Sequence, residues 1–93
     1  MREIVLDTET TGLSPQNGDR VVEIGCVELI NHIATGKTYQ TYLNPQKPME
    51  PSAEEVHGLS NEFLRDQPLF EEIFRDFLDF ISDSPLVIHN ADF

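Results

Sequence analysis

The 93 residues suffice for one small domain, and 39% hydrophobic with 25% charged residues is typical of a globular protein. Seventeen acidic residues oppose six basic ones, so the net charge of −11 excludes a surface that binds bulk duplex DNA through lysines and arginines. No apolar run approaches the roughly 18 residues of a membrane span. The early acids also argue against a signal peptide. We therefore expect a cytoplasmic protein with no membrane partner.

The first half of the chain predicts three β-strands. Residues 3–9 begin with an uninterrupted aliphatic run, Ile4 to Leu6, which predicts a strand buried on both faces and central in its sheet. Residues 20–30 are rich in β-branched side chains and predict a second strand, in which the single cysteine, Cys26, is expected to be a core residue. Residues 31–36 then predict a hairpin connection, and residues 37–43 a half-exposed third strand.

The second half predicts helices and one further strand. Ser52 and Glu55 form an S-x-x-E capping box for a short helix that ends near Gly58, and Ser60 can cap another. Residues 70–81 predict the longest helix, because apolar residues recur at i, i+3, i+4, i+7, i+8 and i+11. We expect this stripe to lie in the core; it consists of Phe70, Ile73, Phe74, Phe77, Leu78 and Ile81. Residues 86–89 predict a fourth strand.

The resulting order is β-β-β-α-β, an α/β arrangement with a mixed sheet. Short connections predict that the first three strands are antiparallel, and the helical crossover allows the fourth to run parallel to the first. No second long helix is present to cover the other face of the sheet. We therefore expect residues 1–93 to be the front part of a larger domain.

Two acids follow the aliphatic run of the first strand. Asp7 and Glu9 are two residues apart, so both side chains project from one face at the end of the strand. Two adjacent anions repel, and a divalent cation such as Mg²⁺ or Mn²⁺ relieves that repulsion. Two such ions can hold the attacking and leaving oxygens of a phosphodiester. The alternative is structural: acids that discourage edge pairing or accept bonds from nearby backbone.

Three motifs carry a resemblance to a known family. They are D-T-E-T-T-G-L at residues 7–13, V-H-G-L at 56–59 and V-I-H-N-A-D-F at 87–93. Together and in this order, they resemble landmarks of the DnaQ-like, four-carboxylate 3′–5′ exonucleases, in particular the branch of proofreading epsilon subunits of bacterial DNA polymerase III. The resemblance implies a ribonuclease-H-like fold, of which residues 1–93 form the N-terminal part of one exonuclease domain.

The resemblance also implies roles for individual residues. Asp7 and Glu9 would be the catalytic ligands of two divalent ions, Mg²⁺ or Mn²⁺, and would contact substrate through them. Thr10 and His57 would contact the terminal nucleotide, and Gly12 would permit close approach of the backbone. Close relatives often carry a glutamate where this chain has Ser52, so helix capping is the better interpretation of Ser52.

The last residues depart from the complete family pattern. Asp92 occupies a variable position of the second motif and is not expected to bind metal, and His89 is not the general base. The third motif, H-x-A-x-x-D, does not occur in the 93 residues. With two of four carboxylates and no base, which alone contributes about 10²–10⁴-fold, this chain by itself is expected to be nearly inactive.

The implied activity is hydrolysis of the 3′-terminal phosphodiester of DNA for replication proofreading. The substrate would be a single-stranded or frayed 3′ end, and the partners would be the catalytic and other core subunits of DNA polymerase III. Three alternatives stay open: an RNA or oligonucleotide exonuclease of the same fold, a phosphatase with an aspartyl nucleophile, and a non-catalytic module that binds the polymerase.

Overall fold

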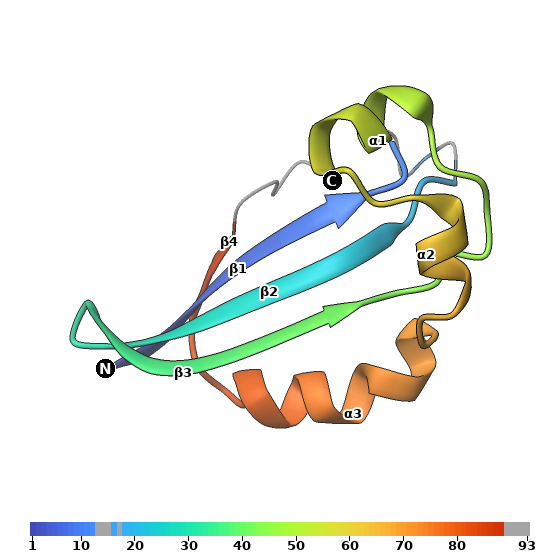
Figure 1. Ribbon diagram of the computed structural model, residues 1–93. Helices are drawn as coiled ribbons and strands as arrows, with labels where there is room; N and C mark the ends of the chain where they lie inside the picture. The colour runs from blue at the N-terminus through green and yellow to red at the C-terminus, as the bar shows by residue number, and fades with distance from the viewer. Residues whose placement is uncertain (13–15, 17, 89–93) are drawn as a thin grey trace.

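A computed structural model describes residues 1–12, 16 and 18–88 (Figure 1). Its elements are β1 (Arg2–Thr10), β2 (Val21–Ile30), β3 (Ile33–Tyr42), α1 (Pro51–His57), α2 (Asn61–Arg65), α3 (Phe70–Ile81) and β4 (Leu86–Ile88). The strands form one sheet in the order β3-β2-β1-β4, in which β4 alone runs parallel to its neighbour. The predicted mixed α/β sheet, its β-β-β-α-β order and the central place of β1 are therefore confirmed. No helix among the described residues has the length and apolarity to cross a membrane.

The main core lies between the sheet and α3, which runs along one face of it (Figure 1). Ile4 of β1 is fully buried, and Cys26 of β2 is 2% exposed. Cys26 is thus the core residue that the sequence predicted, and burial raises the pKa of its thiol. Because side chains alternate along a strand, Ile4 and Leu6 face α3 whereas Asp7 and Glu9 point to the opposite face.

A second core cluster holds the short helices at the other end of the sheet. Val22 of β2, Met49 and Leu64 of α2 are buried together, and Ala53 of α1 packs against them. Figure 1 shows α1 beside the C-terminal end of β1. These contacts bring α1 to the strand end that carries the predicted functional residues.

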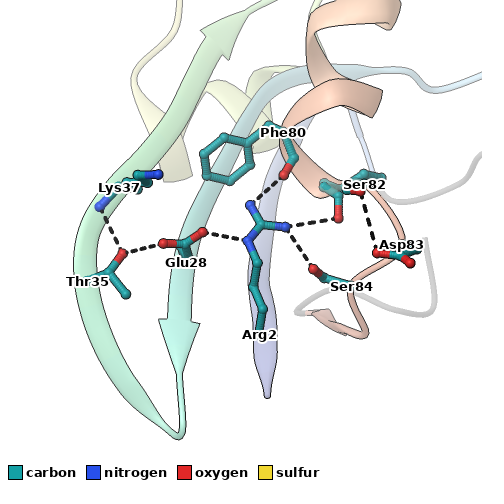
Figure 2. Close-up of polar contacts among 9 residues, drawn as sticks. Arg2, Glu28, Thr35, Lys37, Phe80, Ser82, Asp83 and Ser84 are labelled. Carbon is teal, nitrogen blue, oxygen red and sulfur yellow. Dashed lines mark hydrogen bonds and ion pairs between the residues drawn. The ribbon is translucent and has the colours of Figure 1, made fainter.

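A polar network closes the N-terminal end of β1 (Figure 2). The Arg2 guanidinium donates to the Glu28 carboxylate, to the carbonyl oxygens of Phe80 and Ile81, and to Ser84 Oγ at 2.7 Å. It thereby caps the C-terminus of α3, where backbone carbonyls lack partners within the helix. Arg2 first, and then the Thr35 hydroxyl, lower the pKa of Glu28.

The hairpin between β2 and β3 is shorter than predicted. Asn31 and His32 form its turn with φ values of 51° and 69°, and Ile30 pairs directly with Ile33. Positive φ at both central residues is the geometry that two-residue hairpins favour. The predicted connection over residues 31–36 is therefore too long, because residues 33–36 belong to β3, whose register with β2 shifts near Gly36.

The start of α1 corrects another prediction. The helix begins at Pro51 with Glu50 as its N-cap, and no side chain caps it, so the capping box of Ser52 and Glu55 is not formed. Pro51 accounts for the shift, since its fixed φ suits the first helical position. The predicted end is confirmed: Gly58, at a φ of 73°, donates its N–H to Glu54. The predicted cap at Ser60 is also confirmed, since its hydroxyl accepts from Phe63 N–H.

The long helix has the predicted bounds, but only part of its apolar stripe is buried. Ile73 is buried and Phe77 packs against the core, whereas Phe70, Phe74 and Leu78 are 41%, 48% and 43% exposed. The expectation that the whole stripe lies in the core is therefore wrong for these three residues. Phe70 and Phe74 line an open pocket together with Val21 of β2 and Leu43, and within the described part of the chain α3 packs mainly against the sheet.

Candidate active site

The end of β1 brings Asp7 and Glu9 together on the face opposite α3. In the antiparallel pairing with β2, Asp7 lies opposite Gly25 and Glu9 lies opposite Glu23. Directly opposed residues share a face of the sheet. These residues and Thr8 line an open pocket of about 240 Å³. Because Gly25 has no side chain, the space next to Asp7 stays open.

Neither carboxylate is neutralised by a lysine or arginine in the described part of the chain. Asp7 Oδ1 accepts a hydrogen bond from the N–H of Thr8 at 2.9 Å, which orients the carboxylate without removing its charge. Asp7 is exposed and Glu9 half-buried, so both can be reached from solvent. The cost of holding two anions side by side is therefore not offset by an internal cation among these residues.

This donor set suits a hard divalent cation. Mg²⁺ is usually held by one or two carboxylates together with water and substrate phosphate oxygens. Among the residues that the structure describes, no group of three or more histidine, cysteine or acidic side chains is arranged to hold a metal ion. Asp7 and Glu9 can thus supply part of a coordination sphere, and their role as metal ligands stays a prediction. A bound ion would supply positive charge to the phosphoryl oxygens.

Glu23 was missed by the sequence reasoning. Its carboxylate lines the same pocket, opposite Glu9, and accepts from Gln40 Nε2 at 2.8 Å. Only the register between β1 and β2 could have predicted this position. The residues that join these strands form a long connection, and long connections, unlike two-residue turns, do not fix register.

Thr10 and His57 meet at the end of β1. His57 Nδ1 accepts from the N–H of Leu59 at 3.1 Å, so the proton is assigned to Nε2, which donates to the carbonyl oxygen of Thr10 at 3.0 Å. The Thr10 hydroxyl donates to the carbonyl of Gly12 at 2.6 Å. The structure therefore brings the two residues together through backbone bonds, and their contact with a nucleotide stays a prediction.

The side chain of Asp19 leaves room only for a glycine at position 12. A Cβ atom at this residue would lie 2.5 Å from Oδ2 of Asp19, so no other residue fits without displacing that carboxylate. The backbone does approach another group closely, as the sequence suggested, but the group observed here is a side chain of the same protein.

Two histidines and one acid complete the account of the predicted residues. Nδ1 of His32 lies 3.2 Å from Oε1 of Glu3 beside the hairpin, at the end of β1 that is far from Asp7 and Glu9. His89 and Asp92 lie outside the described residues.

Among the alternatives, the phosphatase requires a helix after the first strand, and β2 occupies that place as an antiparallel strand.

The fold and the acidic pocket define a class of protein. A family model described as an exonuclease matches residues 4–93. The chain therefore belongs to the exonuclease family, and the resemblance drawn from its three motifs is confirmed.

The similar proteins with known names narrow the comparison to one kind of exonuclease subunit. The chain is 57% identical over 93 residues to the DNA polymerase III subunit epsilon of Rickettsia prowazekii, covering all of this chain and 41% of that protein. It is 48% identical over 96 residues to the subunit of the same name from Haemophilus influenzae, covering 99% of this chain and 38% of that protein. The chain thus spans about two fifths of the length of these relatives.

Solved structures agree with the fold. Exonuclease X in complex with 5′ overhanging duplex DNA matches with a TM-score of 0.81 and 26% identity, over 98% of this chain and 50% of that chain. Exonuclease I matches with a TM-score of 0.77 and 16% identity, over 94% of this chain and 20% of that chain, which supports the fold alone. The ribonuclease-H-like exonuclease fold predicted from the sequence is confirmed.

Proposed function

We propose that the protein is a 3′–5′ exonuclease that hydrolyses the 3′-terminal phosphodiester of DNA in replication proofreading. The observation that carries this proposal is the pair Asp7 and Glu9, side by side on the open face of a central strand, neither of them paired with a lysine or arginine among the described residues. The names of the two relatives support the proofreading role. Residues 1–93 would be the N-terminal part of one exonuclease domain.

Metal binding and nucleotide contact would fall to two neighbouring sets of residues at the end of β1. Asp7 and Glu9 would hold Mg²⁺ or Mn²⁺, two ions in the complete site, and β1 would fix the distance between the two carboxylates. Thr10 and His57 would border the terminal nucleotide beyond the end of the strand. In this arrangement His57 acts through its bond to the Thr10 carbonyl, which holds the strand end in place.

The charge of the protein supports a small, local substrate contact. A net charge of −11 disfavours a long duplex, whereas a frayed single-stranded 3′ end needs only its last nucleotides to enter the site. Delivery of that end would depend on a partner. The catalytic subunit of DNA polymerase III and the other core subunits are the partners that we propose.

The test compares Asp7→Asn with Glu3→Gln in the complete protein, using a 5′-labelled oligonucleotide. Both changes remove one negative charge from β1, and both positions lie on the same face, but Glu3 is paired with His32 near the hairpin. Losing a residue that hydrogen-bonds to a metal ligand lowers metal affinity or activity by about 10–100-fold, so losing the ligand itself should lower the rate at least about 100-fold. Glu3→Gln should leave the rate within about twofold, because surface changes away from a site rarely matter.

Two results would contradict the proposal. Equal rates for Asp7→Asn and wild type would remove Asp7 from the chemistry and favour a non-catalytic module. Faster trimming of RNA than of DNA would favour an RNA exonuclease of the same fold. The 93 residues alone should trim the oligonucleotide barely at all, and vigorous, chelator-sensitive trimming by them would show that the missing motif is dispensable.

A further inference from the structure

A buried carboxylate lies behind the turn that follows β1. Asp19 is 9% exposed, and its Oδ1 accepts from the Thr11 hydroxyl and from Lys47 Nζ, each at 2.9 Å. Its other oxygen lies against Gly12, where a Cβ would clash. One side chain thus contacts the turn after β1 and the loop between β3 and α1.

Backbone bonds join the same segments. Thr11 N–H donates to the carbonyl of Arg20 at 2.8 Å, and Arg20 N–H donates back to the Thr11 hydroxyl at 3.0 Å. Glu50 N–H, at the start of α1, donates to the Thr11 carbonyl at 2.9 Å. His57, at the end of α1, donates to Thr10. The turn is therefore fixed relative to both β2 and α1.

Stability alone does not explain a charged pair at this place. A buried ion pair rarely stabilises a fold more than apolar side chains of the same volume would. Asp19 without its partner would add a buried anion against the turn that follows Asp7 and Glu9, in a chain that already has a net charge of −11. Lys47 neutralises Asp19 while keeping its hydrogen bonds to the turn.

We propose that the Asp19–Lys47 ion pair positions the Thr10–Gly12 turn to receive the terminal nucleotide. Asp19 and Lys47 would be positioning residues: they act on Thr11 and Gly12 and do not touch the substrate. The metal ligands, which β1 itself fixes, do not depend on the pair. This inference rests on the proposed function, because it assumes that a nucleotide binds at the end of β1.

The test measures two affinities and one stability on the 93-residue chain. Mg²⁺ alone, and then thymidine 5′-monophosphate at saturating Mg²⁺, are titrated while backbone amide NMR shifts are followed. Urea unfolding gives the stability of each variant. The variants are Asp19→Asn, Lys47→Met and Lys47→Arg, with Glu28→Gln as the matched control, since Glu28 is a similarly buried acid paired with Arg2 at the far end of β1.

For Asp19→Asn and Lys47→Met, we expect Mg²⁺ affinity within about twofold of wild type and nucleotide affinity about tenfold lower. Such a loss corresponds to a turn that holds its binding geometry about one tenth as often. Lys47→Arg should restore nucleotide affinity, and the double variant should be no weaker than either single one, because the two residues act together. Glu28→Gln should lower stability but neither affinity.

Unchanged nucleotide affinity in Lys47→Met would overturn the inference, and so would an equal loss in Glu28→Gln, which would indicate general destabilisation. Lys47 lies nearer the surface than Asp19, so its variants keep the test decisive if Asp19→Asn does not fold. Failure of the proposed function has a different signature: wild type itself would then bind neither probe at Asp7 and Glu9, which would overturn both ideas.

Discussion

The two ends of β1 use acidic side chains in opposite ways. At the N-terminal end, Glu28 is buried against the Arg2 guanidinium, which also binds the last carbonyls of α3 (Figure 2). At the C-terminal end, Asp7 and Glu9 lie in an open pocket, and no lysine or arginine of the described chain is paired with them. A carboxylate that is paired with a cation of the same protein stabilises the fold, whereas an unpaired, accessible carboxylate is available to a ligand.

The difference between the two ends helps to interpret the role of Asp19. Asp19 has the internal cation and burial of Glu28 but lies at the same end of the strand as Asp7. Its position suggests that an internally paired acid can serve the site by holding the backbone around it. The two ends can be separated by experiment, because stability and metal affinity should respond to different residues.

The largest effect on stability should come from the core that joins the two ends. Ile4 is fully buried between the sheet and α3, so Ile4→Ala should lower the free energy of unfolding by about 2–5 kcal/mol. Ile33→Ala is the matched control: Ile33 is 71% exposed, and its loss should cost no more than about 1 kcal/mol. Urea unfolding measures both. Similar losses in the two variants would contradict the position of the core.

Removing the cation at the structural end should destabilise the fold without changing the site. Arg2→Met leaves Glu28 buried without its cation and the C-terminus of α3 without its cap, so the urea midpoint should fall. Arg75→Met removes the same charge from an exposed position on α3 and should change stability by no more than about 0.5 kcal/mol. Reduced Mg²⁺ affinity in folded Arg2→Met would show that the two ends are not independent.

The pH dependence of stability should report the same pair. The pKa of Glu28 is lowered in the folded state, first by Arg2, from its usual 4.5. Below that value the unfolded chain binds more protons than the folded one, so stability falls with falling pH. The contribution of Glu28 is complete above pH 4.5 and is lost as the pH falls through the lower, folded value.

Urea unfolding of wild type and Glu28→Gln across this range provides the measurement. The difference between the two proteins should be constant from pH 7 down to about 4.5 and should shrink below it. A difference that grows as the pH falls would mean that the pKa of Glu28 is raised rather than lowered.

The sequence predicted those parts of the fold that depend on local pattern. The aliphatic run of residues 4–6 placed β1 in the centre, and the spacing from Phe70 to Ile81 gave the bounds of α3. It did not predict which edge of α3 is buried, because that depends on how the helix is rotated against the sheet. The result is that Phe74 and Leu78 are exposed.

The candidate site was predictable to the same degree. Alternation along a strand was enough to place Asp7 and Glu9 on one face. Glu23 and Asp19 were not predictable, because each reaches the site through a long-range pairing: one through the register of β2, the other through Lys47, 28 residues further along the chain. Such contacts leave no periodic signal in the sequence.

The most direct test of the account is a Mg²⁺ titration of the isotope-labelled chain, following backbone amide shifts. The account predicts weak, saturable binding, with the largest shifts at residues 6–10 and 23–25, abolished by Asp7→Asn and retained in Glu3→Gln. Tight binding that survives Asp7→Asn, or shifts centred on Arg2 and Glu28, would contradict the assignment of the open carboxylates as the metal site.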